Sequence, residues 1–346
     1  MADHLLDVEN LQVSFATEDG LVRAVDEVSF TLDRGEVVAI VGESGSGKSV
    51  SAMTLMGLTR SPNSRFGGSA RLNGRELITA SEHDFESIRG KEIAMIFQDP
   101  ISSLSPVHRI GDQIVEQIRA HEDISKPAAF DRAVELMERV GIPSAADRAR
   151  AYPHEFSGGM RQRAMIAMAL SLSPSVLIAD EPTTALDVTI QAQILEEFKQ
   201  LRASGESGVI FVTHDLGVVA DIADRVLVMY AGRVVEQGTL DEIFYDPQHP
   251  YTWGLLGSIT RMDREPPRRL PAIPGLPPSL INAPAGCHFR PRCPHEFAQC
   301  MEVPKLESHI AEAPEHADRC WLEVEEKRTR RLINGRIGLT EGTVIA

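Results

Sequence analysis

The chain has 346 residues, enough to bury a large core, which suggests one large domain with an appendage or two domains. Its formal net charge of −15 argues against nucleic acid as the main partner, because phosphate binding favours a basic face. No apolar run reaches the roughly 18 residues that a membrane helix needs, and residues 1–4 lack the character of a signal peptide. We therefore expect a cytosolic chain that acts at a membrane only through a partner.

The first part of the chain predicts β-structure. Alternating hydrophobic residues predict strands near Leu6–Phe15 and Val28–Leu32, with a turn at Glu18-Asp19-Gly20. The continuous apolar run Val37–Val41 predicts a buried strand of an α/β sheet. Asn73-Gly74 predicts a hairpin further along.

A glycine-rich loop follows the buried strand directly. It reads GESGSGKS and fits the phosphate-loop pattern G-x-x-x-x-G-K-[ST], which a chance match would satisfy in about one chain in a hundred of this length. Backbone N–H groups and the dipole of a helix starting at Lys48 would bind phosphate oxygens. We expect Lys48 to reach the β- and γ-phosphates of ATP and Ser49 to ligate Mg²⁺. The residues expected to bind the nucleotide here are Gly42, Glu43, Ser44, Gly45, Ser46, Gly47, Lys48, Ser49 and Val50.

From about Gln98 to Tyr152 the pattern becomes helical. Ser125 is predicted to cap a helix that has Pro127 in its first turn and that stops at Gly141. The later return to strands makes this region a helical insertion in a mainly parallel sheet wrapped by helices.

Two further apolar runs predict buried strands, Val176–Ala179 and Val209–Thr213, with a helix between them that closes near Gly205. The first run leads into Asp180 and Glu181. These carboxylates would lie at the carboxyl end of a buried strand, where α/β folds bind ligands. Asp180 suits the Mg²⁺ shell, and Glu181 suits the polarisation of an attacking water.

One further segment narrows the class of nucleotide-binding protein. Residues 156–163 read FSGGMRQR and resemble the signature motif of ATP-binding-cassette (ABC) proteins, with Phe and Met where many members have Leu and Gln. In the expected order, Gln98 resembles the Q-loop, Ala185-Leu186-Asp187 the D-loop and His214 the switch histidine. Phe15 stands where the family has an aromatic residue that stacks on adenine. Taken singly, Gln98 could be a surface turn, and His214 and Phe15 could be core residues.

The resemblance implies a P-loop NTPase fold of the α/β class. A nucleotide-binding domain at residues 1–262 would contain a β-subdomain and a helical subdomain at about 98–165. Ser157, Gly158 and Gly159 would grip the γ-phosphate of ATP held by an opposing subunit, so that two cassettes close head-to-tail around two ATP molecules. The catalytic residues implied are Lys48, Gln98, Glu181 and His214; Ser49, Gln98 and Asp180 form the Mg²⁺ set, and Asp187 joins the nucleotide-binding set.

The resemblance is closest to the ATPase subunits of oligopeptide and dipeptide importers, and it extends to about Trp321. Residues 96–100 resemble their Q-loop, although Ser105 stands where Asn is usual, and residues 230–232 and 249–252 match the end of those cassettes. The implied partners are a related second ATPase subunit, two membrane permease subunits and, through the complex, an extracytoplasmic substrate-binding protein. The chain would then lie at the cytoplasmic face of the inner membrane. Two alternatives stay open: the chain could serve an importer of nickel or of a sugar, or it could be a cassette ATPase that acts outside transport.

Beyond Arg261 the composition changes. Six of the thirteen residues from Pro266 to Pro278 are proline, which predicts a stiff connector at the start of a C-terminal extension, residues 263–346. A cysteine-bearing segment at about 285–322 follows, and then a charged stretch, Glu323–Arg331, that we expect to be a solvated helix.

The four cysteines of the chain all lie in this extension: Cys287, Cys293, Cys300 and Cys320. Such clustering in a cytosolic protein points to metal rather than disulfides. The spacing lacks the close pairs of zinc sites and is not a ferredoxin run, so zinc, iron–sulfur and four free thiols all stay open. The resemblance implies a [4Fe–4S] cluster. Arg290, Arg292 and Arg319 could offset its charge or could simply be solvated.

Overall fold

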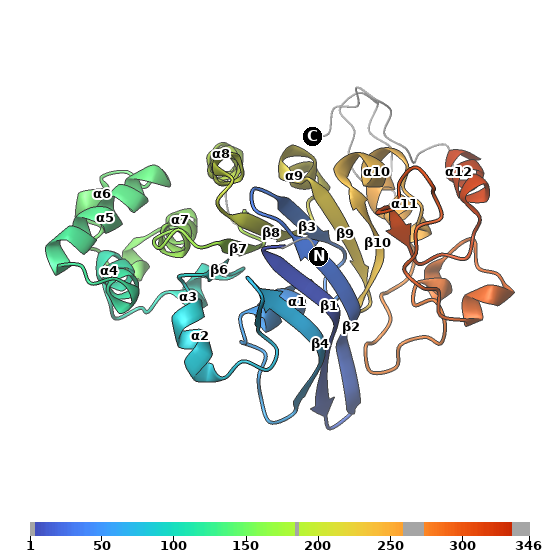
Figure 1. Ribbon diagram of the computed structural model, residues 1–346. Helices are drawn as coiled ribbons and strands as arrows, with labels where there is room; N and C mark the ends of the chain where they lie inside the picture. Colours follow the sequence, from blue (N-terminus) through green and yellow to red (C-terminus); the bar gives the residue numbers. More distant parts are fainter. Residues whose placement is uncertain (1–3, 184–186, 259–272, 334–346) are drawn as a thin grey trace.

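Two β-sheets, helices on both sides of the larger sheet and a C-terminal segment make up the fold (Figure 1). The computed structural model of the chain describes residues 4–183, 187–258 and 273–333, and the structural statements below concern these residues. The domain boundary predicted at residue 262 and most of the proline-rich connector lie outside them. No helix in the described ranges is both long enough and apolar enough to span a membrane.

The larger sheet has seven strands in the order β11-β10-β9-β3-β8-β7-β6, and the five from β9 to β6 are parallel. Their bounds are β3 Val37–Val41, β6 Ile93–Ile96, β7 Val176–Asp180, β8 Gly208–Thr213, β9 Arg225–Tyr230, β10 Arg233–Thr239 and β11 Ala317–Asp318. The three continuous apolar runs are confirmed as the buried strands β3, β7 and β8. Since these strands are parallel, their carboxyl ends meet at one edge, which positions the candidate site.

The strand β3 is buried on both of its faces. Val38 and Ile40 pack with the helix α1, Lys48–Leu55, and the smaller sheet. Ala39 and Val41 pack on the opposite face with α9, Leu216–Ile222. Burial on both faces is why the strand reads as a continuous apolar run instead of an alternating one.

The smaller sheet is antiparallel, in the order β2-β1-β4-β5. Its strands are β1 Leu6–Thr17, β2 Gly20–Leu32, β4 Ser64–Leu72 and β5 Arg75–Glu76. The turn after β1 and the hairpin at Asn73-Gly74 lie where the sequence predicts them. The strand β2 starts eight residues earlier than expected, at Gly20 instead of Val28. Register shifts between β1 and β2 interrupt the alternation there, and a bulge of this kind hides a strand from its periodicity.

The remaining helices are α2 Glu82–Ile88, α3 Pro100–Ser103, α4 Ile110–His121, α5 Lys126–Arg139, α6 Ala145–Arg148, α7 Gly158–Ala169, α8 Val188–Ser204, α10 Leu240–Tyr245, α11 Pro250–Gly257 and α12 Val324–Ile333. Short 3₁₀ turns span Pro153–Glu155, Arg290–Arg292 and Ala298–Met301. The predicted ends of α5 and α8 are confirmed: the Ser125 side chain accepts from the backbone N–H of Ala128, and α8 ends at Gly205 in the left-handed conformation.

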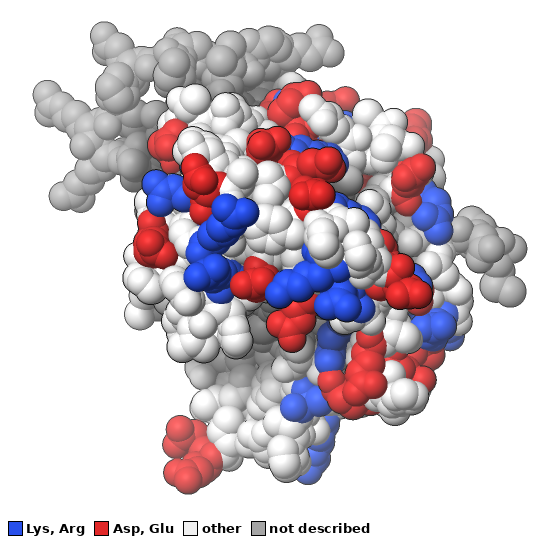
Figure 2. Space-filling view, turned by 90° about the vertical axis from the view of Figure 1, so that its left-hand side faces the viewer, with Lys and Arg blue, Asp and Glu red and all other residues white. Residues whose placement is uncertain are grey.

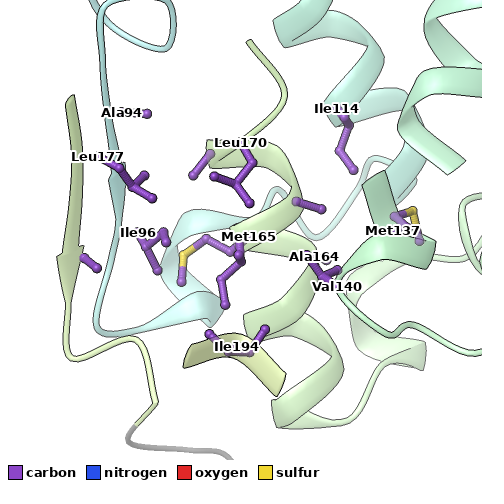
Figure 3. Close-up of a cluster of buried hydrophobic side chains, with 14 of the residues drawn as sticks. Ala94, Ile96, Ile114, Met137, Val140, Ala164, Met165, Leu170, Leu177 and Ile194 are labelled. Atoms are coloured by element: carbon purple, nitrogen blue, oxygen red, sulfur yellow. The ribbon is translucent and has the colours of Figure 1, made fainter. Parts of the chain in front are cut away.

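The helix α7 packs between the edge of the large sheet and the outer helices (Figure 3). On one side Met165 lies toward Ile96 of β6. On the other side Ala164 lies toward Met137 and Val140 at the end of α5. This shared apolar core holds the start of α7 in a defined position relative to β6 and β7.

The outer face of the helical layer, α4 to α6, carries charges of both signs. Figure 2 shows Lys and Arg side chains interspersed with Asp and Glu across this face. Several of them pair, as in Lys126–Asp112 at 3.5 Å and Arg132–Glu122 at 2.8 Å. Exposed pairs of this kind stabilise little, so the layer is held mainly by the apolar core beneath it.

The C-terminal segment is joined to the large sheet through its short strand β11, in which Asp318 pairs with Glu236 of β10. The expectation that residues 323–331 form a solvated helix is wrong in part. Lys327 of α12 is 0% exposed, and its Nζ donates to both carboxylate oxygens of Asp318 at 2.7 and 2.9 Å. A buried ammonium requires such a partner. Because the partner stands nine residues away, outside the helix, the charge pattern of the helix does not reveal it.

Candidate functional site

The loop after β3 has a backbone that only glycine can supply at two positions. Gly42 has a φ of 150°, and a Cβ there would meet the carbonyl oxygen of Met229 at 2.1 Å. Gly47 has a φ of 102°, and its Cβ would meet the carbonyl oxygen of Ala24 at 2.3 Å. The loop therefore folds tightly against its neighbours, and α1 starts at Lys48 as predicted.

Lys48 lies inside this loop. Its Nζ donates to the carbonyl oxygens of Gly42 at 2.8 Å and Glu43 at 3.0 Å. Burial lowers the pKa of Lys48, while the nearby Glu181, Asp180 and Glu43 carboxylates act in the opposite direction. The ammonium is thus anchored at the mouth of a helix N-terminus, where anions bind.

Ser49 and Asp180 meet across the sheet edge. The Ser49 hydroxyl donates to Asp180 Oδ1 at 3.0 Å. Burial raises the pKa of Asp180, and the negative charge of the adjacent Glu181 acts in the same direction. The hydrogen bond from Ser49 lowers this pKa and so offsets part of the rise. A hydroxyl and a carboxylate side by side, with a second carboxylate next to them, are the oxygen ligands that Mg²⁺ prefers. The donor set therefore fits the predicted Mg²⁺.

Glu181 is held at both carboxylate oxygens. Its Oε2 accepts from Gln98 Nε2 at 3.1 Å, and its Oε1 lies 3.0 Å from His214 Nδ1. Its backbone has a φ of 49°, a conformation that costs a non-glycine residue energy, and its N–H donates to the carbonyl oxygen of Val212 at 2.8 Å. The structure thus brings together three predicted catalytic residues from three separate parts of the chain.

The chain is similar to known families and to individual proteins. A family profile described as "ABC transporter" matches residues 25–184, and one described as "Oligopeptide/dipeptide transporter, C-terminal region" matches residues 235–300. The oligopeptide transport ATP-binding protein OppD of Bacillus subtilis is 57% identical over 319 residues, which is 92% of this chain and 88% of that protein. OppD of Salmonella typhimurium is 51% identical over 325 residues, 94% of this chain and 96% of that protein. The chain belongs to the ABC transporter family.

The fold of this ABC ATPase is confirmed by solved structures. The ATP-binding cassette MJ0796, in a dimeric post-hydrolysis state bound to ADP and Pi, matches with a TM-score of 0.62 and 25% identity. The match covers 68% of this chain and 98% of that chain. The predicted P-loop NTPase fold and the predicted family are both correct.

The signature residues of the ABC ATPase lie apart from its phosphate loop. Ser157 caps α7 by accepting from the N–H of Met160 at 3.3 Å. Gly158 is exposed, and a Cβ added there would meet no atom within 4 Å. Figure 1 draws α7 beside the β6 edge and α1 under the middle of the sheet. Within the described ranges no hydrogen bond or ion pair joins residues 157–159 to residues 42–49. The start of α7 is therefore not part of this chain's own phosphate loop.

Two other predicted nucleotide contacts stay predictions. Phe15 is half-buried on β1 and packs against the core of the smaller sheet. Asp187 caps α8 by accepting from the N–H of Ile190 at 3.0 Å. Ala185 and Leu186, the other two residues of the predicted D-loop, lie outside the described residues.

Two residues without a predicted role also contact the site. Gln162, 1% exposed, donates from Nε2 to the carbonyl oxygen of Pro182 at 2.8 Å and ties α7 to the turn after Glu181. The Tyr251 hydroxyl accepts from the N–H of Glu43 at 2.9 Å. Both residues lie in segments that resemble the family, but nothing in their local sequence indicates these contacts.

All four cysteines are free thiols, and they line a single pocket. No Asp or Glu lines that pocket. Burial raises the pKa of Cys287 and of Cys320, and raises that of Cys293 to about 12. Over the described part of the chain, no group of three or more His, Cys, Asp or Glu is placed to hold a metal ion.

The arginines near the cysteines are not solvated. Arg292 forms an ion pair with Glu43 at 2.7 Å, and Arg319 donates to the carbonyl oxygens of Val234 and Pro304 at 3.0 and 3.1 Å. Arg290 is mostly buried and lies 3.7 Å from the Glu296 carboxylate. The simple solvated interpretation of these three residues is therefore wrong, because each is used to hold the segment in place.

Proposed function

We propose that this chain is the ATP-hydrolysing subunit of a membrane importer for oligopeptides or dipeptides. The observation that carries the proposal is the Glu181 carboxylate, bound by Gln98 and His214 beside the Ser49–Asp180 pair. The peptide class is supported by relatives named as oligopeptide and dipeptide transport ATP-binding proteins, which are about as long as this chain.

In the proposed mechanism, Lys48 and the backbone N–H groups of residues 42–49 bind the phosphates of ATP. Ser49, Asp180 and Gln98 would hold Mg²⁺, which neutralises charge on the β- and γ-phosphates when bound. Glu181 polarises a water for in-line attack on the γ-phosphate. His214 holds the Glu181 carboxylate in place and offsets the charge that develops.

A complete site would need a second cassette. Ser157, Gly158 and Gly159 would grip the γ-phosphate of ATP bound to that partner, with Asp187 near the contact. This is supported by the exposure of Gly158, by the place of α7 at the β6 edge of the sheet, and by the dimeric state of the related cassette MJ0796. We further propose a related, non-identical partner ATPase, two permease subunits, an extracytoplasmic substrate-binding protein and a place at the cytoplasmic face of the inner membrane.

We also propose that the four cysteines hold a [4Fe–4S] cluster. Thiolate sulfur is the usual ligand of such clusters, and the shared pocket offers four thiols and no carboxylate. When bound, the group would staple a segment that has little regular structure.

The substitution Glu181→Gln tests the proposed activity in the reconstituted complex. ATP binding should persist, while steady-state hydrolysis should fall by about 10²-fold or more, because the amide cannot polarise water. Sustained turnover by this variant contradicts the assignment. Stimulation of the ATPase activity of the complex by peptides, and not by nickel or sugars, would distinguish a peptide importer from the other importer classes. Co-purification with membrane subunits would distinguish an importer from other cassette ATPases.

The cluster is tested on full-length chain purified without oxygen. Iron and sulfide should be present in nearly equal amounts, with visible absorption that disappears in a variant with all four cysteines changed to serine. Colourless protein that contains zinc, or no metal at all, contradicts the cluster.

A further inference from the structure

Arg292 of the C-terminal segment reaches the phosphate loop. Its guanidinium binds the Glu43 carboxylate through two parallel hydrogen bonds, from Nη1 to Oε2 at 2.7 Å and from Nη2 to Oε1 at 3.0 Å. The two residues are 249 positions apart in the sequence. The Arg292 side chain is 6% exposed, whereas that of Glu43 is 25% exposed. This partly buried, two-point ion pair has a better-defined geometry and is less screened by solvent than a surface pair.

Every donor of this guanidinium has an acceptor. Besides the two bonds to Glu43, Nη1 donates to the Tyr230 hydroxyl at 3.2 Å, Nε to the carbonyl oxygen of Pro274 at 2.9 Å, and Nη2 to that of Ile273 at 3.2 Å. Burial by itself lowers the pKa of Arg292, but the hydrogen bonds to Glu43 and Tyr230 raise it above its usual value. The guanidinium is therefore a fixed positive charge in a fixed orientation.

Glu43 is an unfavourable residue for a loop that binds a triphosphate, because its carboxylate carries the same sign of charge. It lies one position after Gly42 and acts electrostatically on Lys48, the loop's cation. Unpaired, the carboxylate would repel the phosphates and compete for that ammonium. In the structure its charge is instead turned toward the C-terminal segment and balanced there.

The backbone of Glu43 is held from the same side. Its N–H donates to the Tyr251 hydroxyl at 2.9 Å, and the Tyr251 ring packs on Tyr230 with 4.6 Å between centroids. Tyr230 in turn lies under Arg292, whose Cζ is 5.7 Å from the ring centroid. Tyr251 and Arg292, joined through the Tyr230 ring, thus hold both the main chain and the side chain of Glu43.

We propose that Arg292 is a positioning residue of the ATP site, which neutralises Glu43 and draws its carboxylate away from the triphosphate. The C-terminal segment thereby completes the phosphate loop. The inference rests on the proposed function only in that residues 42–49 bind ATP. Cys293 follows Arg292 directly, so the turn that presents the guanidinium to the loop also brings this cysteine to its pocket.

The test is the dissociation constant for MgATP, measured by calorimetry on the full-length chain. We expect Arg292→Ala to weaken binding by about tenfold or more, because it leaves a partly buried carboxylate unpaired in the loop. Glu43→Gln should change the constant by less than about threefold, because it removes the repelling charge itself. The double variant Arg292→Ala with Glu43→Gln should recover most of the affinity lost in Arg292→Ala.

The recovery distinguishes charge neutralisation from a merely structural role. If Arg292 only holds the segment folded, the double variant binds ATP as weakly as Arg292→Ala, and the inference fails. Equal affinity of the wild type and Arg292→Ala also overturns it. Should Arg292→Ala not fold, Arg292→Lys keeps the charge but loses the two-point contact, and Glu43→Gln should then improve its ATP affinity.

Two controls complete the design. Arg225→Ala breaks another partly buried Arg–Glu pair, with Glu36 at 3.1 Å, outside the phosphate loop, and should leave ATP affinity unchanged. Lys48→Ala should abolish binding in every background. If ATP still binds without Lys48, the proposed site is wrong; if Lys48 is essential but Arg292 has no effect, only the further inference is wrong.

Discussion

His214 Nδ1 and Glu181 Oε1 lie 3.0 Å apart, although 33 residues separate them in the chain. The Glu181 side chain is 14% exposed and that of His214 is 59% exposed. The carboxylate is therefore nearly enclosed, while the imidazole stands between it and solvent. This pair joins the ends of β7 and β8 at the edge of the sheet where ATP is expected.

Replacing His214 by alanine should lower hydrolysis by about 10²-fold or more, because the Glu181 carboxylate loses the group that orients it. ATP affinity should change little, since His214 does not contact the phosphate loop. Phosphate release by the complex and calorimetric binding measure the two effects. The matched control is His4→Ala, which breaks another His–carboxylate pair, with Asp33 at 2.7 Å, far from this edge. Equal loss in both variants would contradict the prediction.

Gly42→Ala should abolish ATP binding and destabilise the chain, because its Cβ would meet the carbonyl oxygen of Met229 at 2.1 Å. Gly74→Ala is the control: Gly74 also has a positive φ, of 78°, but a Cβ there meets no atom within 4 Å. It should cost about 1 kcal/mol of stability and leave ATP binding intact. Urea unfolding and calorimetry measure these two properties. Normal ATP affinity in Gly42→Ala would show that the loop can relax.

Asp318→Ala should reduce the free energy of unfolding by about 3–5 kcal/mol, because it leaves the fully buried Lys327 ammonium without its partner. The double variant Asp318→Leu with Lys327→Met should recover most of the lost free energy of unfolding. Glu307→Ala, which breaks the exposed pair with Lys305 at 3.8 Å, should cost less than about 1 kcal/mol. Chemical unfolding of the three variants decides; equal costs for the buried and exposed pairs would be inconsistent with this interpretation.

The stability of the chain should fall as the pH rises above about 6.5, the ordinary pKa of histidine. Burial lowers the pKa of His316, but the hydrogen bond of its Nε2 to Glu236 Oε1 at 2.9 Å, together with Glu242 and Asp318, raises it overall. The folded state therefore binds this proton more tightly than the unfolded state. Its contribution is complete below the unfolded pKa and is lost as the pH passes the folded pKa.

Urea unfolding at a series of pH values measures how the free energy of unfolding changes with pH. In His316→Gln, the fall above pH 6.5 that His316 causes should be absent. Asp318 titrates lower, since burial raises its pKa only to about 6, so its own effect falls in a more acidic range. An unchanged slope in His316→Gln would rule out this residue as the cause.

Much of the candidate site could be predicted because its information is local. The glycines of residues 42–49 set their own backbone, and a helix starts where the loop ends. The apolar runs of β3 and β7 are buried in any sheet that packs on both faces, which places Asp180 and Glu181 at a strand end. Together with the resemblance of residues 156–163 to the ABC signature motif, these segments were enough to predict the fold and the family.

Partner choice over long sequence distances was decided only by the tertiary structure. Arg292 and Glu43 are 249 residues apart, and an arginine in a loop has the same local pattern whether it is solvated or buried on a carboxylate. Lys327 was expected to face solvent for the same reason. The sequence by itself determined which segments bind phosphate and which are buried. Only the folded chain decided which charges meet, because a buried charge is tolerated solely where packing brings an opposite charge beside it.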